Sequence, residues 1–215
     1  MKPDPLHAND SPMSGDLDTH GQDARLHTGR LILTPADPHR VPDVDLLIEG
    51  LRQSGFLGEP LSVQAAATGE GERAFAIGPG FLSLLTFAGC AVRIRDSRSD
   101  GRFSHIRIAQ VSPYPRLMVG RNTRSPRCVG CRAPLSGWRE LVDHWATHPH
   151  AGVRCPACGE TRPPWLWDWK QQGGFGRVFV QIEEVFPGEA VPTPAFFEQL
   201  IRVSGIGWRH FYIRD

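Results

Sequence analysis

Two cysteine pairs constrain this chain of 215 residues more than any other feature of its sequence. Cys128 and Cys131 are separated by two residues, as are Cys155 and Cys158, and 23 residues lie between the pairs. A Cys-x-x-Cys turn brings two sulfur atoms within reach of one metal ion, and four thiolates surround zinc as a tetrahedron. The spacing therefore predicts one structural zinc ion per chain, held by these four residues.

The surroundings of the second pair support this prediction. Pro156 follows its first cysteine and Gly159 follows its second, and both residue types tighten such a turn. The segment 128–158 resembles the zinc-ribbon (rubredoxin-like) group. The resemblance implies a small module that is stabilised by its metal and inserted into a larger chain.

A second ligand set is compatible with the same segment. Its spacing is C-x2-C-x12-H-x3-H, which resembles a C2H2 zinc finger, with Leu135 and Leu141 as core residues and Ser136 as the cap of a helix. The alternative ligands are Cys128, Cys131, His144 and His148. We prefer the four-cysteine set, because the finger leaves a free dithiol and because thiolate is the stronger zinc ligand. The helix then packs through Leu135, Trp138, Leu141, Val142 and Trp145.

Catalytic chemistry has little support in the sequence. Cys-Pro-Ala-Cys resembles a thioredoxin-type motif, but that motif needs a helix to lower the thiol pKa, and Pro163-Pro164 disfavours a helix there. The chain contains no nucleophile elbow, P-loop, HExxH motif or dinucleotide loop. Four cysteines also leave no open position on a metal, whereas two cysteines and one histidine would leave room for a water. We expect a protein without enzymatic activity.

The rest of the chain predicts an α+β fold, with helices packed on antiparallel strands in a small α/β body. We expect a disordered tail at 1–29, an α+β part at 30–127, the zinc module at 128–158, and a strand–helix–strand part at 159–215 that packs with 30–127. The tail has no apolar leader segment, so we expect a cytoplasmic, reducing location. Only two of the 24 cationic residues are lysines, which indicates GC-rich coding and a bacterial source.

Local signals place several elements within these parts. Apolar residues predict strands near 31–33, 178–182 and 208–213. Asp43 predicts a helix over 44–54, and Thr193-Pro194 predicts a helix over 194–203 that ends at Gly205. Ser99-Asp100-Gly101 predicts a hairpin that joins Val92 and Ile94 to Ile106 and Ile108.

One uncharged stretch, from Ala74 to Val92, requires a test against a membrane span. Gly78-Pro79-Gly80 interrupts it, so only Phe81–Val92 remains, which is too short to cross a bilayer. We therefore expect no membrane partner and interpret 81–92 as a buried core element, with Cys90 as a small buried apolar residue.

Arginine is concentrated in the middle of the chain. Residues 93–139 contain eleven arginines and two aspartates, a net charge of +9. Arginine suits phosphate, and tryptophans spaced two apart on an extended segment could stack on bases. The candidate nucleic-acid-binding residues are Arg116, Arg121, Arg124, Arg127, Arg132, Trp165, Trp167 and Trp169. Alternatively, the arginines are solvated and the tryptophans attach the module to the body.

These observations predict a zinc-binding protein that acts as a protein-interaction or adaptor module for an unidentified protein partner. The alternative is a nucleic-acid-binding protein that uses the arginine-rich stretch 93–139 together with the zinc module.

Overall fold

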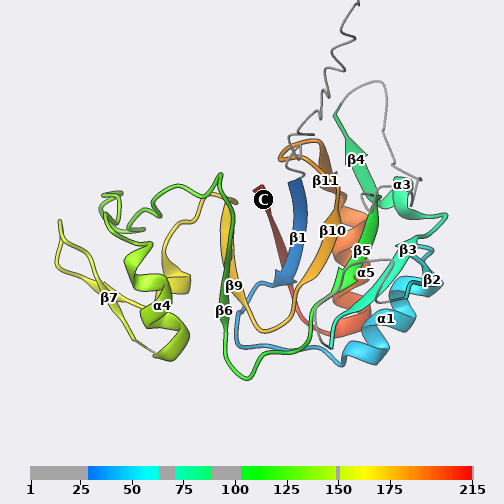
Figure 1. Ribbon diagram of the computed structural model, residues 1–215, viewed down its shortest axis with the longest axis horizontal. Coiled ribbons are helices and arrows are strands. Elements are labelled where there is room, and N and C mark those ends of the chain that lie inside the picture. The colour runs from blue at the N-terminus through cyan, green and yellow to red at the C-terminus, as the bar shows by residue number, and fades with distance from the viewer. Residues whose placement is uncertain (1–28, 63–70, 89–102, 149–150, 215) are drawn as a thin grey trace, which may run out of the picture.

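The computed structural model describes residues 29–62, 71–88, 103–148 and 151–214 of the chain. The fold is mixed α+β and mostly β, which confirms the predicted class. A body of sheet and helices lies at one end, and a smaller cysteine-containing part lies at the other (Figure 1). The predicted tail falls outside the described residues, as do Cys90, Val92 and Ile94.

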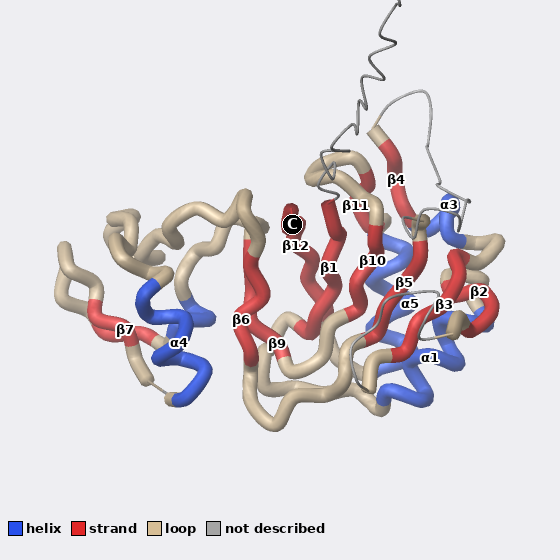
Figure 2. The backbone as a smooth tube through the Cα atoms, in the orientation of Figure 1, coloured by secondary structure: helices blue, strands red, loops and turns tan. Residues whose placement is uncertain are grey.

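A six-stranded antiparallel sheet forms the centre of the body, in the order β12-β1-β10-β5-β3-β2 (Figure 2). Its strands are β1 (Gly29–Pro35), β2 (Leu57–Pro60), β3 (Arg73–Ile77), β5 (His105–Ile108), β10 (Val180–Glu183) and β12 (Trp208–Arg214). Strands from both ends of the sequence alternate in it, because β1 pairs with β10 on one side and with β12 on the other.

Helices α1 (Val44–Gln53) and α5 (Pro194–Ser204) cover one face of this sheet. Both begin as predicted: the Asp43 carboxylate accepts from two backbone N–H groups of the first turn, and the Thr193 hydroxyl accepts from the N–H of Phe196. Gly205 ends α5 in the left-handed conformation, with φ of 69°. The apolar core on this face contains Leu47 and Leu51 of α1, Phe196 and Leu200 of α5, Leu31, Leu33, Val180 and Ile182 of the sheet, and Val178 just before β10.

The structure describes the uncharged run 74–92 as far as residue 88, and 81–88 is not the single buried core element that was predicted for 81–92. The run begins in β3, turns at Gly78, and continues as the single-turn helix α3 (Phe81–Leu84) and the short strand β4 (Leu85–Phe87). Strand β4 pairs with β11 (Ala190–Pro192), about a hundred residues later in the chain. None of the helices in the described ranges has the length and apolar character that a bilayer crossing needs.

The predicted hairpin is also wrong in its pairing. Strand β5 lies between β10 and β3: Ile106 is opposite Ile182 on one side and Phe75 on the other. Both edges of β5 are therefore occupied by strands other than the expected partner. The alternation of Ile106 and Ile108 signals the buried face of a central strand, not one half of a hairpin.

The other face of the sheet carries a two-stranded ribbon of β6 (Arg116–Val119) and β9 (Gly173–Gly176). All four residues of β9 are buried, and a Cβ atom on Gly174 would lie only 2.8 Å from the ring of Phe211 in β12. Strand β9 therefore approaches the sheet more closely than a side chain would permit.

Phe175, between the glycines of β9, points the opposite way and belongs to a second apolar cluster. We call residues 121–172 the cysteine module, because their apolar side chains form this cluster with Phe175. The module contains α4 (Glu140–Thr147), β7 (Val153–Arg154), β8 (Thr161–Arg162) and the 3-10 turn η1 (Pro164–Leu166). One face of strand β9 therefore packs against the body, and its other face packs against the cysteine module.

Candidate metal centre

The two cysteine pairs lie in turns with the same backbone hydrogen bonds. The N–H of Cys128 donates to Ala133 O at 2.9 Å, and the N–H of Arg132 donates back to Cys128 O at 2.9 Å. In the second turn, the N–H of Cys155 donates to Glu160 O at 2.8 Å, and the N–H of Gly159 donates to Cys155 O at 2.9 Å. The two halves of the site are therefore equivalent in their local structure.

Each turn requires a left-handed residue directly after its second cysteine. Gly159 meets this requirement with φ of 76°, and Arg132 has φ of 65° at the equivalent position. Glycine adopts this conformation readily, whereas a residue with a Cβ atom is strained there. Gly159 was part of the predicted motif, but the conformation of Arg132 could only be found by comparing the two turns.

The four sulfur atoms form a compact group. They lie within 4.8 Å of one another, with 3.8 Å between the Sγ atoms of Cys128 and Cys158 and 3.6 Å between those of Cys131 and Cys155. A tetrahedron with Zn–S bonds of about 2.3 Å has S···S edges of roughly 3.8 Å, whereas a disulfide needs about 2.05 Å. The four cysteines could therefore hold one metal ion, and all four are free thiols.

Backbone N–H groups favour the thiolate form at the first cysteine of each pair. The N–H of Cys131, followed by that of Gly130, lowers the pKa of Cys128 to about 6. The N–H of Cys158, followed by that of Ala157, lowers the pKa of Cys155 in the same way. These N–H groups therefore favour charged sulfur, which is the form that binds a metal.

The pKa of Cys158 is shifted in the opposite direction, toward the protonated thiol. The N–H of Glu160 favours its thiolate, but hydrogen bonds to the sulfur atoms of Cys155, Cys131 and Cys128, together with burial, raise its pKa to about 12. Thiolates this close repel one another, which favours the protonated form of Cys158. A bound dication would supply the charge that allows all four to ionise.

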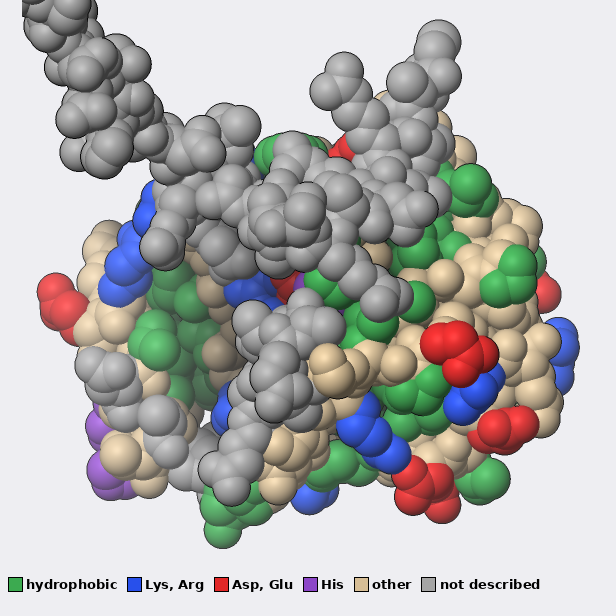
Figure 3. Space-filling view, turned by 45° about the vertical axis from the view of Figure 1, so that its right-hand side comes forward, with side chains coloured by type: hydrophobic (Ala, Val, Ile, Leu, Met, Phe, Trp, Pro, Cys, Tyr) green, Lys and Arg blue, Asp and Glu red, His purple; other side chains and the backbone are tan. Residues whose placement is uncertain are grey.

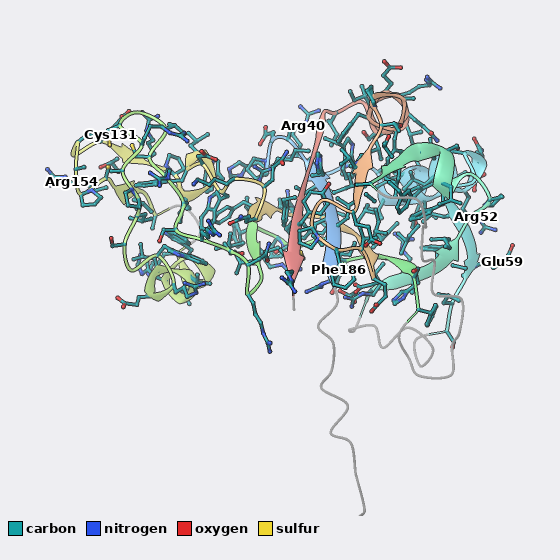
Figure 4. The ribbon with its side chains drawn as sticks, turned by 90° about the horizontal axis from the view of Figure 1, so that it is seen from above. Arg40, Arg52, Glu59, Cys131, Arg154 and Phe186 are labelled. Atoms are coloured by element: carbon teal, nitrogen blue, oxygen red, sulfur yellow. The ribbon has the colours of Figure 1, made fainter. Side chains whose placement is uncertain are left out.

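The sulfurs lie at the end of the cysteine module, near the surface. Cys128 and Cys155 are buried, whereas Cys131 and Cys158 are exposed. Figure 4 shows Cys131 and Arg154 at the end of the molecule far from Arg52 and Glu59 of the body. The ion pair between Glu160 and Arg162, at 2.5 Å, lies beside Gly130 and so connects the second turn to the first.

The alternative ligands are not part of this group. His144 lies on α4 and His148 is the C-cap residue that follows it; both are exposed, and their rings are stacked with 4.5 Å between the centroids. Among the described residues, the one cluster of histidine, cysteine or acidic side chains that could hold a metal contains the four cysteines alone. The helix also begins at Glu140 with no side-chain cap, so the predicted start of this helix at Ser136 was wrong.

The five apolar residues predicted to pack together do so, but not all of them on one helix. Trp145 of α4 is buried in the module core with Leu135 and Trp138, which precede the helix, and Leu141 and Val142 of α4 are half-buried against them. Cys128 and Cys155 belong to the same cluster, so the two cysteine turns and the apolar core are one unit.

The tryptophans do not form an extended platform, contrary to that hypothesis. The segment turns through η1, so the three rings do not share one open face. Trp167 and Trp169 are 3% and 5% exposed, and Trp169 has edge contacts with Trp138, Trp145 and Phe175. Trp165 is half-buried against His39 of the body. These positions agree with the alternative that the rings attach the module to the body.

The arginines of the basic stretch serve several purposes. Arg107 is half-enclosed between Glu72 and Glu183, at 3.0 and 2.6 Å, on the sheet face that carries β6 and β9. Within the module, Arg127 donates to Arg132 O, and Arg132 pairs with Asp168 at 2.9 Å.

Three of the predicted arginines, Arg116, Arg121 and Arg124, are exposed and have no ion pair among the described residues. On the face that Figure 3 shows, Lys and Arg side chains lie in several separate places and not in one continuous patch.

Asp168 is a structural residue that the sequence did not reveal. Its backbone exchanges two hydrogen bonds of 2.9 Å with Arg127, directly before the first cysteine turn, and its carboxylate pairs with Arg132, directly after it. The tryptophan segment is thereby fixed to the first cysteine turn. A lone acidic residue between two tryptophans was the available signal.

The strained turn gives a first prediction. Arg132→Gly is expected to be more stable than Arg132→Ala by about 1 kcal/mol. Both changes remove the ion pair with Asp168, but only alanine keeps a Cβ atom in the left-handed conformation. Urea unfolding of the metal-loaded proteins would measure the difference.

The matched control is the same pair of substitutions at Arg154 in β7, where φ is not positive and alanine should be at least as stable as glycine. Equal stability of the two variants at position 132 would show that this turn is not strained.

Comparison with known proteins gives no relative from which to transfer a function. No family model matches the chain, and no curated protein and no solved structure is significantly similar to it.

Proposed function

We propose that this is a zinc-binding protein without enzymatic activity, in which one structural zinc ion per chain supports a module that contacts a protein partner. The observation that carries the proposal is the group of four cysteine sulfurs within 4.8 Å of one another, in two equivalent turns. Zinc is the expected metal for four thiolates in a tetrahedral arrangement. Four protein ligands leave no open position for a substrate or for an activated water.

A structural role fits the size of the module. Its described regular elements are one eight-residue helix, a three-residue 3-10 turn and a ribbon of two two-residue strands, which is little secondary structure to hold its apolar cluster together. Metal binding in such a module supplies much of the free energy of folding. Because Cys128 and Cys155 are part of the apolar cluster, the zinc ion would also fix the positions of Trp138 and Trp145.

An apolar groove supports the interaction role. A cavity of about 280 Å³ lies between the segment Ser112–Leu117 and α4, with Val142, Trp145 and Phe175 in its walls. Tyr114 at its rim is 52% exposed. Because one wall belongs to the body and the other to the cysteine module, the width of the groove depends on the folded module. An apolar side chain of a partner protein would fill it.

Metal content tests the first half of the proposal. Purified protein is expected to contain one zinc ion per chain, Cys155→Ala is expected to lose it, and His144→Ala is expected to keep it. Elemental analysis of the three proteins after dialysis gives the result. Zinc that is retained in Cys155→Ala but lost in His144→Ala would replace the four-cysteine site with the finger.

Binding to a partner tests the second half. A partner captured by the wild-type protein should be lost on Val142→Asp in the groove, and the contact should persist at high salt because it is apolar. Leu82→Asp, at an exposed position on α3, is the matched control and should leave capture unchanged. Capture that survives Val142→Asp would place the contact elsewhere.

Nucleic-acid binding is the second candidate, because Arg116, Arg121 and Arg124 are exposed and have no ion pair in the described ranges. Three phosphate contacts would lower the affinity for a mixed oligonucleotide by about 40-fold between 50 and 200 mM salt. Reversing Arg121, Arg124 and Arg127 to glutamate would then abolish binding. We expect no such binding, and fluorescence anisotropy across a salt series measures it. A steep salt dependence that the reversal removes would make nucleic acid the function.

A further inference from the structure

A second cavity lies where the cysteine module meets the free edge of the six-stranded sheet. It has a volume of about 360 Å³, which is in the range of small-molecule sites. One wall is the edge strand β12, and the opposite wall is the segment from Trp167 to Gly173. The aromatic residues that line it are Trp167, Trp169, Phe197, Trp208 and Phe211.

Two buried donors in this lining have no acceptor. Trp167 is 3% exposed, and its indole Nε1–H has no partner among the described residues. The buried Nε–H of Arg209 is likewise without a partner, although another nitrogen of the same guanidinium donates to Phe175 O at 2.9 Å. A buried donor without an acceptor is costly, so two of them in one cavity require an explanation.

The charge of Arg209 is also uncompensated. No carboxylate pairs with it among the described residues, and burial lowers its pKa. Asp168 is the one carboxylate in the lining, and both of its oxygens are already used: Oδ1 accepts from the N–H of Lys170 and Oδ2 pairs with Arg132, each at 2.9 Å. The cavity therefore offers a positive charge and buried donors, and the one carboxylate in its lining is already engaged elsewhere.

Backbone geometry adds a further donor. The N–H of Tyr212, in the edge strand β12, points away from the sheet and donates to Gln171 O at 2.9 Å. Because strand residues alternate, the N–H of His210, two positions earlier, points to the same outer side, and no strand of the described residues lies beyond β12 in the sheet. The chain holds this wall in place with two consecutive left-handed residues, Lys170 and Gln171, with φ of 52° and 54°.

We propose that this cavity binds a small organic anion, a molecule that carries a carboxylate or a phosphate on a flat apolar ring. The anionic group accepts from Arg209 and from the indole N–H of Trp167, and the ring lies against the aromatic walls. The ammonium group of Lys170, also in the lining, adds to the attraction. This site is distinct from the metal centre and from the apolar groove, but its Trp167 wall needs a folded cysteine module.

The indole N–H signals of the metal-loaded protein in a ¹H–¹⁵N correlation spectrum report on the site directly. AMP and benzoate serve as probes for a phosphate and for a carboxylate on a ring, with adenosine and benzyl alcohol as their uncharged counterparts. We expect AMP or benzoate to shift the Trp167 signal, assigned with Trp167→Phe, and the uncharged counterparts to leave it in place. The probe that binds identifies the anionic group.

Arg209→Met removes the charge and keeps the apolar stem, and it should weaken binding by roughly tenfold or more. Arg209→Lys retains a cation and should weaken it less. Arg202→Met, on the exposed face of α5, is the matched control and should bind as the wild type does.

The inference is overturned if neither anion shifts the Trp167 signal at concentrations up to about 10 mM. It is also overturned if Arg209→Met binds as tightly as the wild-type protein. Zinc content measured on the same sample separates this result from a failure of the metal site, because a protein that retains its zinc and binds neither anion contradicts only the cavity proposal.

Discussion

Replacing Cys155 with serine is expected to release the metal and to unfold the cysteine module while the six-stranded sheet persists. Structural zinc contributes about 10–16 kcal/mol to the folding of small peptides with such sites. The module has few regular elements, and two of its four predicted ligands, Cys128 and Cys155, are part of its apolar core. Losing one ligand therefore removes both the metal and the arrangement of that core.

Amide hydrogen exchange, read together with zinc content, measures this result. Protection should fall across 121–172, including α4 and the β7–β8 ribbon, and should remain in the central strands β1, β10 and β5. A chelator added to the wild-type protein should give the same pattern. His144→Ala is the control, because that histidine is exposed and lies outside the sulfur cluster. Loss of protection that spreads evenly over the sheet would show that the metal supports the whole fold.

Sequence alone predicted the elements whose signals are local. Asp43 and Thr193 cap their helices because a side-chain oxygen next to the first turn is sufficient to bind its free N–H groups. Gly205 ends α5 because glycine readily adopts the left-handed conformation that follows a helix. The alternation of Val180 and Ile182 also placed the buried face of β10 correctly, because every second side chain of a strand points to the same side, although the strand begins two residues later than predicted.

Pairing between distant strands was not predictable in this way. Strand β5 is flanked by β10 and β3, and β4 pairs with β11, because long-range packing selects among many strands with similar patterns. A turn signal at 99–101 suggested the nearest partner in sequence instead. The start of α4 was misplaced because Ser136 has the residue type of a cap, but the chain begins the helix at Glu140.

In the candidate site, too, local signals were predictive and contacts between distant segments were not. Cysteine spacing predicted the four residues that the fold brings together, but spacing alone could not choose between the second cysteine pair and the two histidines. That choice depends on the β7–β8 ribbon, which directs Cys155 inward, and on α4, which directs His144 outward. The strained conformation of Arg132 and the link made by Asp168 depend on contacts between segments and have no strong local signal.

Trp169→Ala is expected to cost about 3–5 kcal/mol of stability, because it empties the centre of the module core. The ring is 5% exposed, contacts Trp138, Trp145 and Phe175 through its edges and face, and donates its indole N–H to Pro164 O at 3.0 Å. For a chain of this size, such a loss lowers the melting temperature by about 10 °C. Calorimetry of the metal-loaded protein gives the measurement.

The matched control is Leu166→Ala, three residues earlier, where the side chain is 50% exposed and the change should stay within about 0.5 kcal/mol. The comparison also tests the two hypotheses for the tryptophans. A ring that serves as an open surface for bases can be removed with little effect on stability, whereas a ring that joins the module to β9 cannot, because Phe175 then loses one of its aromatic contacts. A small effect of Trp169→Ala would therefore contradict the attachment role and restore the case for a stacking surface.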